Sequence, residues 1–350
     1  MKIVHDRAVV LNTRQPHLVT ERVDNYKILK EENGVYKIVI PWGLKESQAL
    51  VDLNVKKVPS PMARDYEFSG RYEPFEHQKK TSFFLTLNKR GFCFNEQGTG
   101  KTASVIWAVD YLMQQGLVNR VLVICPLSIM KSAWQEDLFK FAMHRTCSIA
   151  HGTSTRRKKI VAAGSEFVII NFDGVAVIKD EIMNGGFDMV VVDEANAYKN
   201  TQTNRWKTLR DITAKTPWLW MLTGTPAAQS PVDAFGLAKL VNPNSAPKYF
   251  GQFRDQVMYK ATQFTWRPKK NADKIVHDVL QPAIRFEKSE CLDLPPVTHL
   301  EREVPLTRQQ ATYYKTLKNK MIMEADGEQV TSVNAATNLN KLLQISGGAV

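Results

Sequence analysis

The chain is 350 residues long, which at roughly 150 residues per domain predicts two or three domains with ample length for a core. With 43% hydrophobic and 23% charged residues, the composition excludes a disordered or fibrous chain, and the longest apolar runs are far shorter than the roughly 20 residues of a membrane-spanning helix. The 47 basic residues exceed the 35 acidic ones by 12, so a polyanion is the expected partner.

The four cysteines, Cys93, Cys125, Cys147 and Cys291, lie far apart and form no C-x-x-C pair. This spacing argues against a zinc ribbon and suits free thiols in a reducing compartment. The first seven residues include a carboxylate and a histidine where a secretory signal carries its apolar stretch. We therefore expect a cytoplasmic protein.

Residues 1–66 are predicted to form a small β accessory domain. Two short β-prone runs, Tyr26 to Leu29 and Val35 to Ile40, flank Asn33-Gly34, and Asn-Gly is a strong hairpin signal. The sequence Pro59-Ser60-Pro61 then interrupts the chain and marks the end of this domain.

From residue 67 to 295 the pattern changes to short apolar runs alternating with segments of helical period, as expected for a parallel sheet covered by helices on both faces. Residues Ser128 to Met143 are expected to form one amphipathic crossover helix, with Ser128 as its N-cap. Ligands of such sheets bind at the carboxyl ends of the strands, so the residues after each strand are the functional candidates. The predicted strands are Gly91 to Phe94, Val121 to Cys125, Phe167 to Ile170, Met189 to Val192 and Leu219 to Leu222.

The first of these strands is followed by a phosphate-binding sequence and then by a helical pattern. Glycines at positions 98 and 100 would let backbone N–H groups converge on a phosphate, while the lysine at 101 would place a positive charge on the β- and γ-phosphates and the threonine at 102 would ligate magnesium. The strict pattern G-x-x-x-x-G-K-[ST] requires glycine at position 95, where this chain has asparagine, so we predict a variant P-loop. Its nucleotide-binding residues are Gly98, Thr99, Gly100, Lys101 and Thr102.

Two further strands end in residues suited to nucleotide chemistry. Asp193 and Glu194 follow the fourth predicted strand, and we predict Asp193 as the magnesium ligand and Glu194 as the base that activates the attacking water. After the fifth strand, the hydroxyls of Thr223 and Thr225 are expected to sense the γ-phosphate. Upstream of the P-loop, the amide of Gln78 is predicted to pair with adenine N6 and N7.

These motifs, in this order, resemble the Swi/Snf-type ATPases of helicase superfamily two. The acidic pair continues as Ala195-Asn196-Ala197-Tyr198-Lys199-Asn200, which is similar to the family's D-E-A-H-x-x-K-N box. The T-G-T-P sequence at Thr223 to Pro226 separates this family from DEAD-box RNA helicases, which usually carry S-A-T there. The resemblance covers about residues 70 to 345. Its other motifs are Val121 to Ser128 with Trp134, Phe167 to Asp173, Pro231 with Phe235 to Leu237, Leu294 to Pro296, and Gln309 to Tyr314.

The resemblance implies a RecA-like P-loop lobe in residues 67–295, with ATP and magnesium as cofactors. It also implies duplex DNA as the partner, bound through its phosphate backbone without sequence preference. The compact spacing of the motifs resembles a bacterial or viral member, which places the protein in a bacterial or virus-infected cytoplasm, or in the nucleus if the source is eukaryotic. The implied roles are coupling of ATP state to movement for Asn196, Thr223 and Thr225, and DNA contact for Pro126, Ser128, Asn171 and Lys199.

Two departures from the family pattern matter. Asn196 replaces the usual histidine of the D-E-A-H box, so coupling to movement is expected to differ while metal and water chemistry survive. The family also needs a second RecA-like lobe with an arginine finger, and the chain stops where that lobe should start. We therefore expect residues 296–350 to be a linker and an unfinished start of lobe two, in a fragment of a longer motor. Because such arginines raise rates about 10³- to 10⁵-fold, the chain alone is expected to hydrolyse ATP poorly.

A basic stretch with interleaved aromatic residues lies between positions 260 and 274. Cations can meet phosphates and aromatic rings can stack on bases, so we predict contact with the DNA backbone there, with a second basic run at residues 156–159 as another candidate. If this stretch is only a solvated surface, the DNA is expected across the strand ends instead, near Pro126 and Asn171. The residues concerned in the stretch are Phe264, Trp266, Arg267, Lys269 and Lys270.

The leading interpretation is an ATP-dependent translocase or remodelling motor that acts on double-stranded DNA. An RNA or branched-DNA helicase is the alternative enzyme, because it shares the superfamily core; Lys199-Asn200 and the T-G-T-P sequence argue against it. A non-catalytic, ATP-dependent DNA-binding or partner-docking module is the alternative from another class, since the expected second lobe is absent from the sequence.

Overall fold

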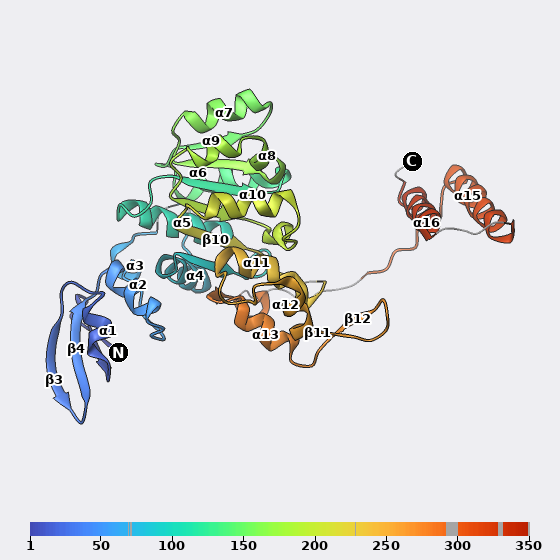
Figure 1. Ribbon diagram of the computed structural model, residues 1–350. Helices are drawn as coiled ribbons and strands as arrows, with labels where there is room; N and C mark the ends of the chain where they lie inside the picture. Colours follow the sequence, from blue (N-terminus) through green and yellow to red (C-terminus); the bar gives the residue numbers. More distant parts are fainter. Residues whose placement is uncertain (69, 71, 228, 292–299, 328–331, 349–350) are drawn as a thin grey trace. The chain divides into compact units, whose positions relative to one another are not determined.

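The computed structural model describes the chain apart from residues 69, 71, 228, 292–299, 328–331 and 349–350, and apart from the side chains of residues 320–336 (Figure 1). The chain divides into two compact units, Met1–Asp293 and Leu294–Val350. The predicted domain limits at residues 66 and 295 stay predictions, and the motif Leu294 to Pro296 lies outside the described residues.

A four-stranded antiparallel sheet begins the first unit, in the order β1 (Lys2–Val4), β2 (Ala8–Thr13), β4 (Val35–Pro41), β3 (Lys27–Glu32). Asn33 and Gly34 join β3 to β4 with φ angles of 51° and 73°, as in a type I′ turn, so the predicted hairpin is confirmed. Helices α1 (Pro16–Thr20) and α2 (Leu44–Asp52) supply residues to the core of this sheet, in which Ile38 and Leu50 are fully buried.

A parallel sheet of seven strands forms the body of the first unit, in agreement with the predicted fold class (Figure 1). All five predicted strands are confirmed to within one residue at each end. The two edge strands are not predicted from the sequence, because they are short, partly exposed and carry no continuous apolar run. The order is β13 (Ala283–Ile284), β5 (Arg90–Cys93), β10 (Trp218–Leu222), β9 (Met189–Val192), β6 (Val121–Cys125), β8 (Phe167–Asn171) and β7 (Cys147–Ala150).

Helices cover both faces of this sheet. Successive residues of a strand point to opposite faces, so neighbouring residues pack against different helices. Phe92 belongs to one buried cluster and Cys93 to the other. The cluster of Cys93 includes residues of α4 (Glu76–Leu87), α5 (Lys101–Gln114) and α6 (Glu136–Phe141), and that of Phe92 includes residues of α8 (Phe172–Val177), α10 (Asn204–Thr213) and α11 (Ala234–Val241). Other helices of this unit are α3 (Met62–Asp65), α7 (Ser154–Ala162), α9 (Lys179–Met183), α12 (Phe250–Val257), α13 (Ala272–Val279) and α14 (Lys288–Cys291).

The segment after β6 differs from the single helix predicted for Ser128 to Met143. It starts as a 3₁₀ turn (Leu127–Ile129), continues as a π-helix (Met130–Gln135) and ends as α6. Ser128 lies inside the 3₁₀ turn, so its predicted N-cap role is wrong. The wider π winding accompanies the burial of Trp134, whose indole N–H donates to Asp193 Oδ2 at 3.0 Å.

A two-stranded antiparallel hairpin, β11 (Met258–Lys260) with β12 (Trp266–Pro268), projects from the body of the first unit (Figure 1). In the second unit, α15 (Arg308–Gly327) packs against α16 (Ser332–Ser346), and Gln310 Nε2 donates to the Ile345 carbonyl at 3.1 Å. In the described part of the chain, no helix has the length and apolar character needed to cross a membrane.

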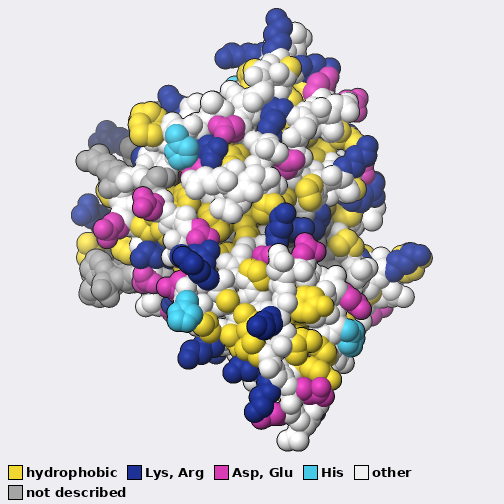
Figure 2. Space-filling model, turned by 90° about the vertical axis from the view of Figure 1, so that its left-hand side faces the viewer, with side chains coloured by type: hydrophobic (Ala, Val, Ile, Leu, Met, Phe, Trp, Pro, Cys, Tyr) yellow, Lys and Arg dark blue, Asp and Glu magenta, His cyan; other side chains and the backbone are white. Residues whose placement is uncertain are grey.

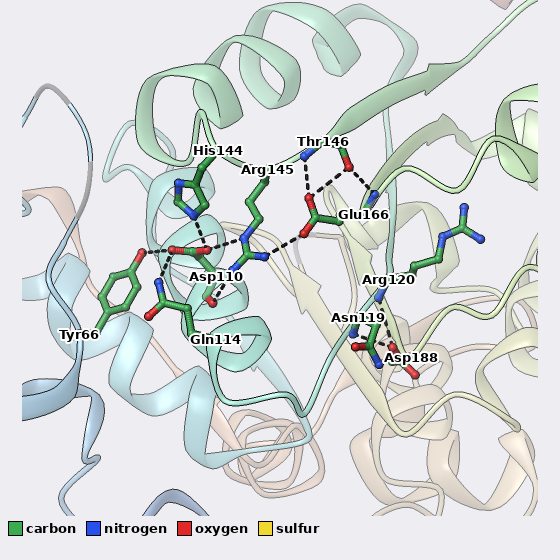
Figure 3. A network of polar contacts seen from close by, with 10 residues as sticks. All are labelled: Tyr66, Asp110, Gln114, Asn119, Arg120, His144, Arg145, Thr146, Glu166 and Asp188. Carbon is green, nitrogen blue, oxygen red and sulfur yellow. Dashed lines mark hydrogen bonds and ion pairs between the residues drawn. The ribbon is translucent and has the colours of Figure 1, made fainter.

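A buried carboxylate holds the helix that follows the P-loop (Figure 3). Asp110, on α5, is fully buried. Its Oδ2 accepts hydrogen bonds from the Tyr66 hydroxyl at 2.8 Å and from the Gln114 amide at 3.1 Å, and its Oδ1 lies 2.8 Å from His144 Nε2 and 2.6 Å from Arg145 Nε. The Asp110 side chain therefore connects α5 to the segment after α3, which carries Tyr66, and to the segment after α6, which carries His144 and Arg145.

Arg145 extends this network to the outer strands of the sheet (Figure 3). Its guanidinium pairs with Glu166 at 2.8 Å, and Glu166 also accepts the Thr146 backbone N–H at 2.7 Å. Burial disfavours charge on Glu166, but the hydrogen bonds from Thr146 and Arg145 outweigh this and hold the pKa of Glu166 below its usual value. The chain entering β7 and the chain entering β8 are thus tied to α5.

Candidate nucleotide-binding site

The P-loop lies at the carboxyl edge of the parallel sheet, between the end of β5 at Cys93 and the start of α5 at Lys101. Gly98 and Gly100 have φ angles of 84° and 77°, which favour glycine. A Cβ on Gly100 would also lie 2.0 Å from Gln78 Nε2, so any other residue at this position would displace the Gln78 amide. The predicted strand–loop–helix arrangement is confirmed, and it points the N-terminus of a 14-residue helix at the loop.

The P-loop lysine bends back over its own loop. Its ammonium donates to the carbonyl oxygens of Asn95 at 2.8 Å and of Glu96 at 3.1 Å. The buried hydroxyl of Thr99 donates to the same Glu96 carbonyl at 2.8 Å. These bonds hold the Lys101 ammonium against the loop backbone, and an ammonium at a helix N-terminus favours an anion there.

The asparagine that replaces the first P-loop glycine has a structural function that the sequence does not predict. Asn95 is 1% exposed, and its Nδ2 donates to Thr81 Oγ1 on α4 at 2.8 Å. Its Oδ1 is buried without a hydrogen-bond partner. The side chain therefore anchors the start of the loop to α4, and it leaves one buried acceptor available.

Gln78 bridges the same helix to the P-loop. Its Oε1 accepts the Phe75 backbone N–H at 2.9 Å, and its Nε2 donates to the Thr99 carbonyl at 3.3 Å. The amide keeps one further donor hydrogen and one further acceptor lone pair, so pairing with adenine is compatible with these bonds. That pairing stays a prediction. A cavity of about 630 Å³ opens beside Gln78, within the usual size of a small-molecule site. The cavity is lined by Phe75, Glu76, His77, Lys80, Phe286, Ser289, Glu290 and Cys291.

Three loops that carry predicted site residues emerge side by side at the carboxyl edge. Strand β10 lies between β5 and β9, so the T-G-T-P turn lies between the P-loop and the acidic pair. The Thr223 N–H donates to the Cys93 carbonyl at 3.1 Å, which joins the turn to the strand of the P-loop. The structure thus brings together residues that are about 125 positions apart in sequence.

Asp193 is positioned by two donors. Its Oδ2 accepts the Trp134 indole N–H at 3.0 Å, and its Oδ1 accepts the Glu194 backbone N–H at 2.9 Å. Burial raises the pKa of Asp193 above its usual value, whereas these donors and the nearby Lys101 oppose that rise. A buried carboxylate of this kind gains from a cation beside it, which fits the predicted role as magnesium ligand. The sequence places Trp134 only in the core and gives no signal of its bond to Asp193.

The D-E-A-N sequence is bonded to the T-G-T-P turn. Glu194 has a φ of 50°, a left-handed conformation that is unusual for a residue other than glycine and is typical of functional sites. Asn196 Nδ2 donates to the Thr225 carbonyl at 2.7 Å and to its hydroxyl at 3.2 Å. The Thr225 N–H in turn points to Thr223 Oγ1 at 3.3 Å. Thr223 is fully buried, so contact between its hydroxyl and a phosphate would require the turn to open.

The candidates for DNA contact on the strands lie at the same edge of the sheet. Pro126 follows Cys125, which is the register partner of Asn171 across β6 and β8, so Pro126 and Asn171 are neighbours. Ser128 is exposed two residues further on. Asn171 Oδ1 accepts from Arg157 at 2.8 Å, and Arg157 is buried. The second basic run therefore contributes at least one structural residue in addition to its exposed lysines.

Lys199 is occupied within the protein. Its ammonium pairs with Asp233 Oδ2 at 3.1 Å and donates to Gln229 Oε1 at 2.5 Å, both of which follow the T-G-T-P turn. Its predicted role in DNA contact stays a prediction, and such contact would compete with this ion pair.

The basic residues of the β11–β12 hairpin differ in their surroundings. Arg267 and Lys270 are exposed, whereas Lys269 is half-buried and its ammonium donates to the Asp255 carbonyl at 2.6 Å. The ring of Phe264, at the tip, is 86% exposed. Trp266 is covered by Arg254, whose guanidinium carbon lies 4.0 Å from the ring centroid, so Phe264 is the better placed of the two for stacking on a base.

Comparison with known proteins identifies the family. Residues 45–346 match the SNF2-related domain. The chain belongs to the SNF2-related domain family. It is 23% identical to the ISWI chromatin-remodeling complex ATPase ISW1 of Saccharomyces cerevisiae, over 79% of this chain and 25% of that protein. It is 22% identical to the lymphoid-specific helicase of Homo sapiens, over 87% of this chain and 39% of that protein.

A phage relative and a solved structure add to this picture. The chain is 22% identical to protein p41 of Acyrthosiphon pisum secondary endosymbiont phage 1, over 75% of this chain and 61% of that protein. It thus spans between a quarter and about three fifths of the length of these relatives. The Sulfolobus solfataricus SWI2/SNF2 ATPase core in complex with dsDNA has the same fold, with a TM-score of 0.56 and 24% identity over 80% of this chain and 59% of that one.

The residues at the carboxyl edge fit a magnesium nucleotide. Magnesium in such sites is held by one or two carboxylates together with phosphate oxygens, and it prefers oxygen ligands. Thr102 Oγ1, at the start of α5, and the buried Asp193 carboxylate are oxygen ligands of this kind, and the loop before α5 carries the left-handed glycines Gly98 and Gly100. These residues would hold the ion when a nucleotide is bound.

Replacing Lys101 with alanine should weaken ATP binding by about 10- to 100-fold, the range for a lost hydrogen bond to a charged group. The melting temperature should change little, because the Lys101 side chain bonds only to loop carbonyls and belongs to none of the buried clusters of the described chain. Calorimetric titration with magnesium ATP measures the affinity. Lys89→Ala, which removes an exposed charge just before β5, is the matched control. Equal affinity of the Lys101 variant and the wild type would refute the P-loop assignment.

Proposed function

We propose that this chain carries the ATP-binding lobe of a DNA-dependent ATPase that moves along or remodels double-stranded DNA. The observation that carries the proposal is the meeting of the P-loop, the T-G-T-P turn and the acidic pair at one edge of the sheet, with bonds from Asn196 to Thr225 and from Thr223 to β5. Duplex DNA as the ligand is supported by the similar fold of an ATPase core in complex with dsDNA.

In this proposal each group has a chemical role. The loop N–H groups and Lys101 bind the phosphates, and Thr102 and Asp193 hold magnesium, which when bound neutralises charge on the phosphates. Glu194 orients the attacking water and accepts its proton. Asn196 transmits the state of the acidic pair to Thr225. A second RecA-like lobe, as part of a longer protein, would supply the arginine that stabilises the transferred phosphoryl group.

Two other functions give different results in one experiment. ATP turnover is measured alone and with duplex DNA, single-stranded DNA and single-stranded RNA of equal length, in a two-lobed form of the protein. Stimulation by duplex DNA above the other two supports the proposal. Stronger stimulation by RNA or branched DNA would favour the helicase. ATP-dependent DNA binding without turnover, despite the second lobe, would favour the non-catalytic module.

We expect duplex DNA to contact the β11–β12 hairpin. On the face shown in Figure 2, lysine and arginine side chains are interspersed with acidic ones, so the distribution of charge on that face does not indicate where DNA would bind. The hairpin and the residues just after it, in contrast, carry the exposed side chains of Phe264, Arg267 and Lys270. Contacts of this kind go to phosphates and release counterions.

Replacing Arg267 and Lys270 together by alanine should weaken duplex binding alike on unrelated sequences. It should flatten the plot of log affinity against log salt by about 2, roughly one unit per lost phosphate contact. Lys269→Ala should change the slope less, because Lys269 already donates to the Asp255 carbonyl. The control variant Lys89→Ala/Lys215→Ala removes two exposed charges that precede β5 and β10, at the opposite edge of the sheet. An unchanged slope would indicate that DNA binds at the strand ends near Pro126 and Asn171 instead of at the hairpin.

A further inference from the structure

The segment after β13 runs along the P-loop. Strand β13 pairs in parallel with β5, and the pairing continues beyond both strands. The Phe94 N–H donates to the Ile284 carbonyl at 2.8 Å, and the Glu96 N–H donates to the Phe286 carbonyl at 3.0 Å. The Glu96 carboxylate then accepts the Lys288 backbone N–H at 2.9 Å. Residues almost 200 positions apart are thereby fixed side by side.

These bonds place the side chain of Lys288 above the loop. A Cβ built on Gly98 would lie 3.2 Å from Lys288 Cε and 3.5 Å from its Nζ. Gly98 is one of the two left-handed glycines of the loop. Within the described chain the Lys288 ammonium makes no ion pair. Its charge is therefore available at the loop, whereas the Lys101 ammonium already donates to two loop carbonyls.

We infer that Lys288 is a second phosphate-binding cation of the nucleotide site and acts together with Lys101. The inference rests on the proposed function as an ATP-binding lobe. The segment that carries Lys288 also supplies Phe286, Ser289, Glu290 and Cys291 to the wall of the 630 Å³ cavity beside Gln78. One short segment thus contacts both the loop and the adjoining cavity, as a wall of a nucleotide site would.

The electrostatics favour this arrangement. A nucleoside triphosphate carries several negative charges within a few ångströms. Two ammonium groups held by different elements of the fold can approach these charges independently of each other. An ammonium is a point charge and needs no fixed donor geometry, so its contribution should grow with the number of phosphates. This dependence distinguishes a phosphate contact from a contribution to folding.

The test is calorimetric titration of the full chain with ATP, ADP and AMP in the presence of magnesium. Lys288→Ala should weaken ATP binding by about 10- to 100-fold, weaken ADP binding less and leave AMP binding nearly unchanged. Lys288→Arg should retain most of the affinity, because it keeps the charge. Lys89→Ala is the matched control at the opposite edge of the sheet. If the alanine variant unfolds, Lys288→Gln keeps the length of the side chain and is titrated in its place.

Each contrary result has a distinct meaning. Wild-type affinity in Lys288→Ala together with a loss in Lys101→Ala would overturn the inference and leave the proposed function standing. Tighter ATP binding would overturn it as well, because the lysine would then obstruct the site. An equal loss for all three nucleotides would show that Lys288 only supports the fold. If the wild-type chain binds none of them, the proposed function fails and the inference with it.

Discussion

Replacing Glu194 with glutamine should lower ATP turnover by about 10²- to 10⁴-fold, the usual contribution of a general base, and leave ATP affinity unchanged. The amide keeps the shape of the side chain and cannot accept a proton from water. The left-handed φ of 50° at this position is equally unfavourable for both residues, so the backbone strain stays the same. Steady-state turnover with duplex DNA and calorimetric ATP binding are measured together, in a form that hydrolyses ATP.

The matched control for this variant is Glu136→Gln. Glu136 is exposed at the start of α6, so the change removes the same charge away from the site. Its turnover should equal that of the wild type. Unreduced turnover in Glu194→Gln would assign the base to another residue, and a joint loss of binding and turnover would show that Glu194 contributes to nucleotide binding.

The strands and the order of their loops could be predicted from sequence because the information is local. Strands β6, β9 and β10 are runs of four or five apolar residues, β8 is such a run apart from its last residue, and β6 and β9 have the predicted limits. In a parallel sheet the residues after each strand meet at one edge, so Lys101, Asp193 and Thr225 could be assigned to one site without coordinates.

The parts that escaped prediction depend on contacts between distant residues. Trp134 and Asp193 are 59 positions apart, and Lys288 and Glu96 are 192 apart, so no spacing rule connects them. The π-helix before α6 has nearly the same apolar pattern as an α-helix, and the pattern therefore cannot reveal the wider winding. Asn95 makes the P-loop motif a variant, and its bond to Thr81 cannot be read from the motif.

Replacing Asp110 with alanine should destabilise the first unit by about 3–5 kcal/mol, the cost of removing one partner of a buried ion pair. Asp110 is fully buried and is contacted by Tyr66, Gln114, His144 and Arg145 (Figure 3). Its removal takes away the acceptor that these four groups share, while Arg145 keeps its pair with Glu166. Because α5 starts at the P-loop lysine, ATP affinity should fall as well. Urea unfolding measures the stability, and titration of the folded fraction measures the affinity.

The comparison that isolates this effect is Asp137→Ala on α6. Asp137 pairs with Lys140 at 2.9 Å, but their side chains are 23% and 45% exposed, and such surface pairs contribute about 0–1 kcal/mol. Both variants remove one aspartate and one negative charge, so a difference between them reports burial. A loss in Asp110→Ala no larger than that in Asp137→Ala would mean that water enters and satisfies the four donors. In that case the network would position α5 without stabilising the unit, and ATP affinity would be the quantity that falls.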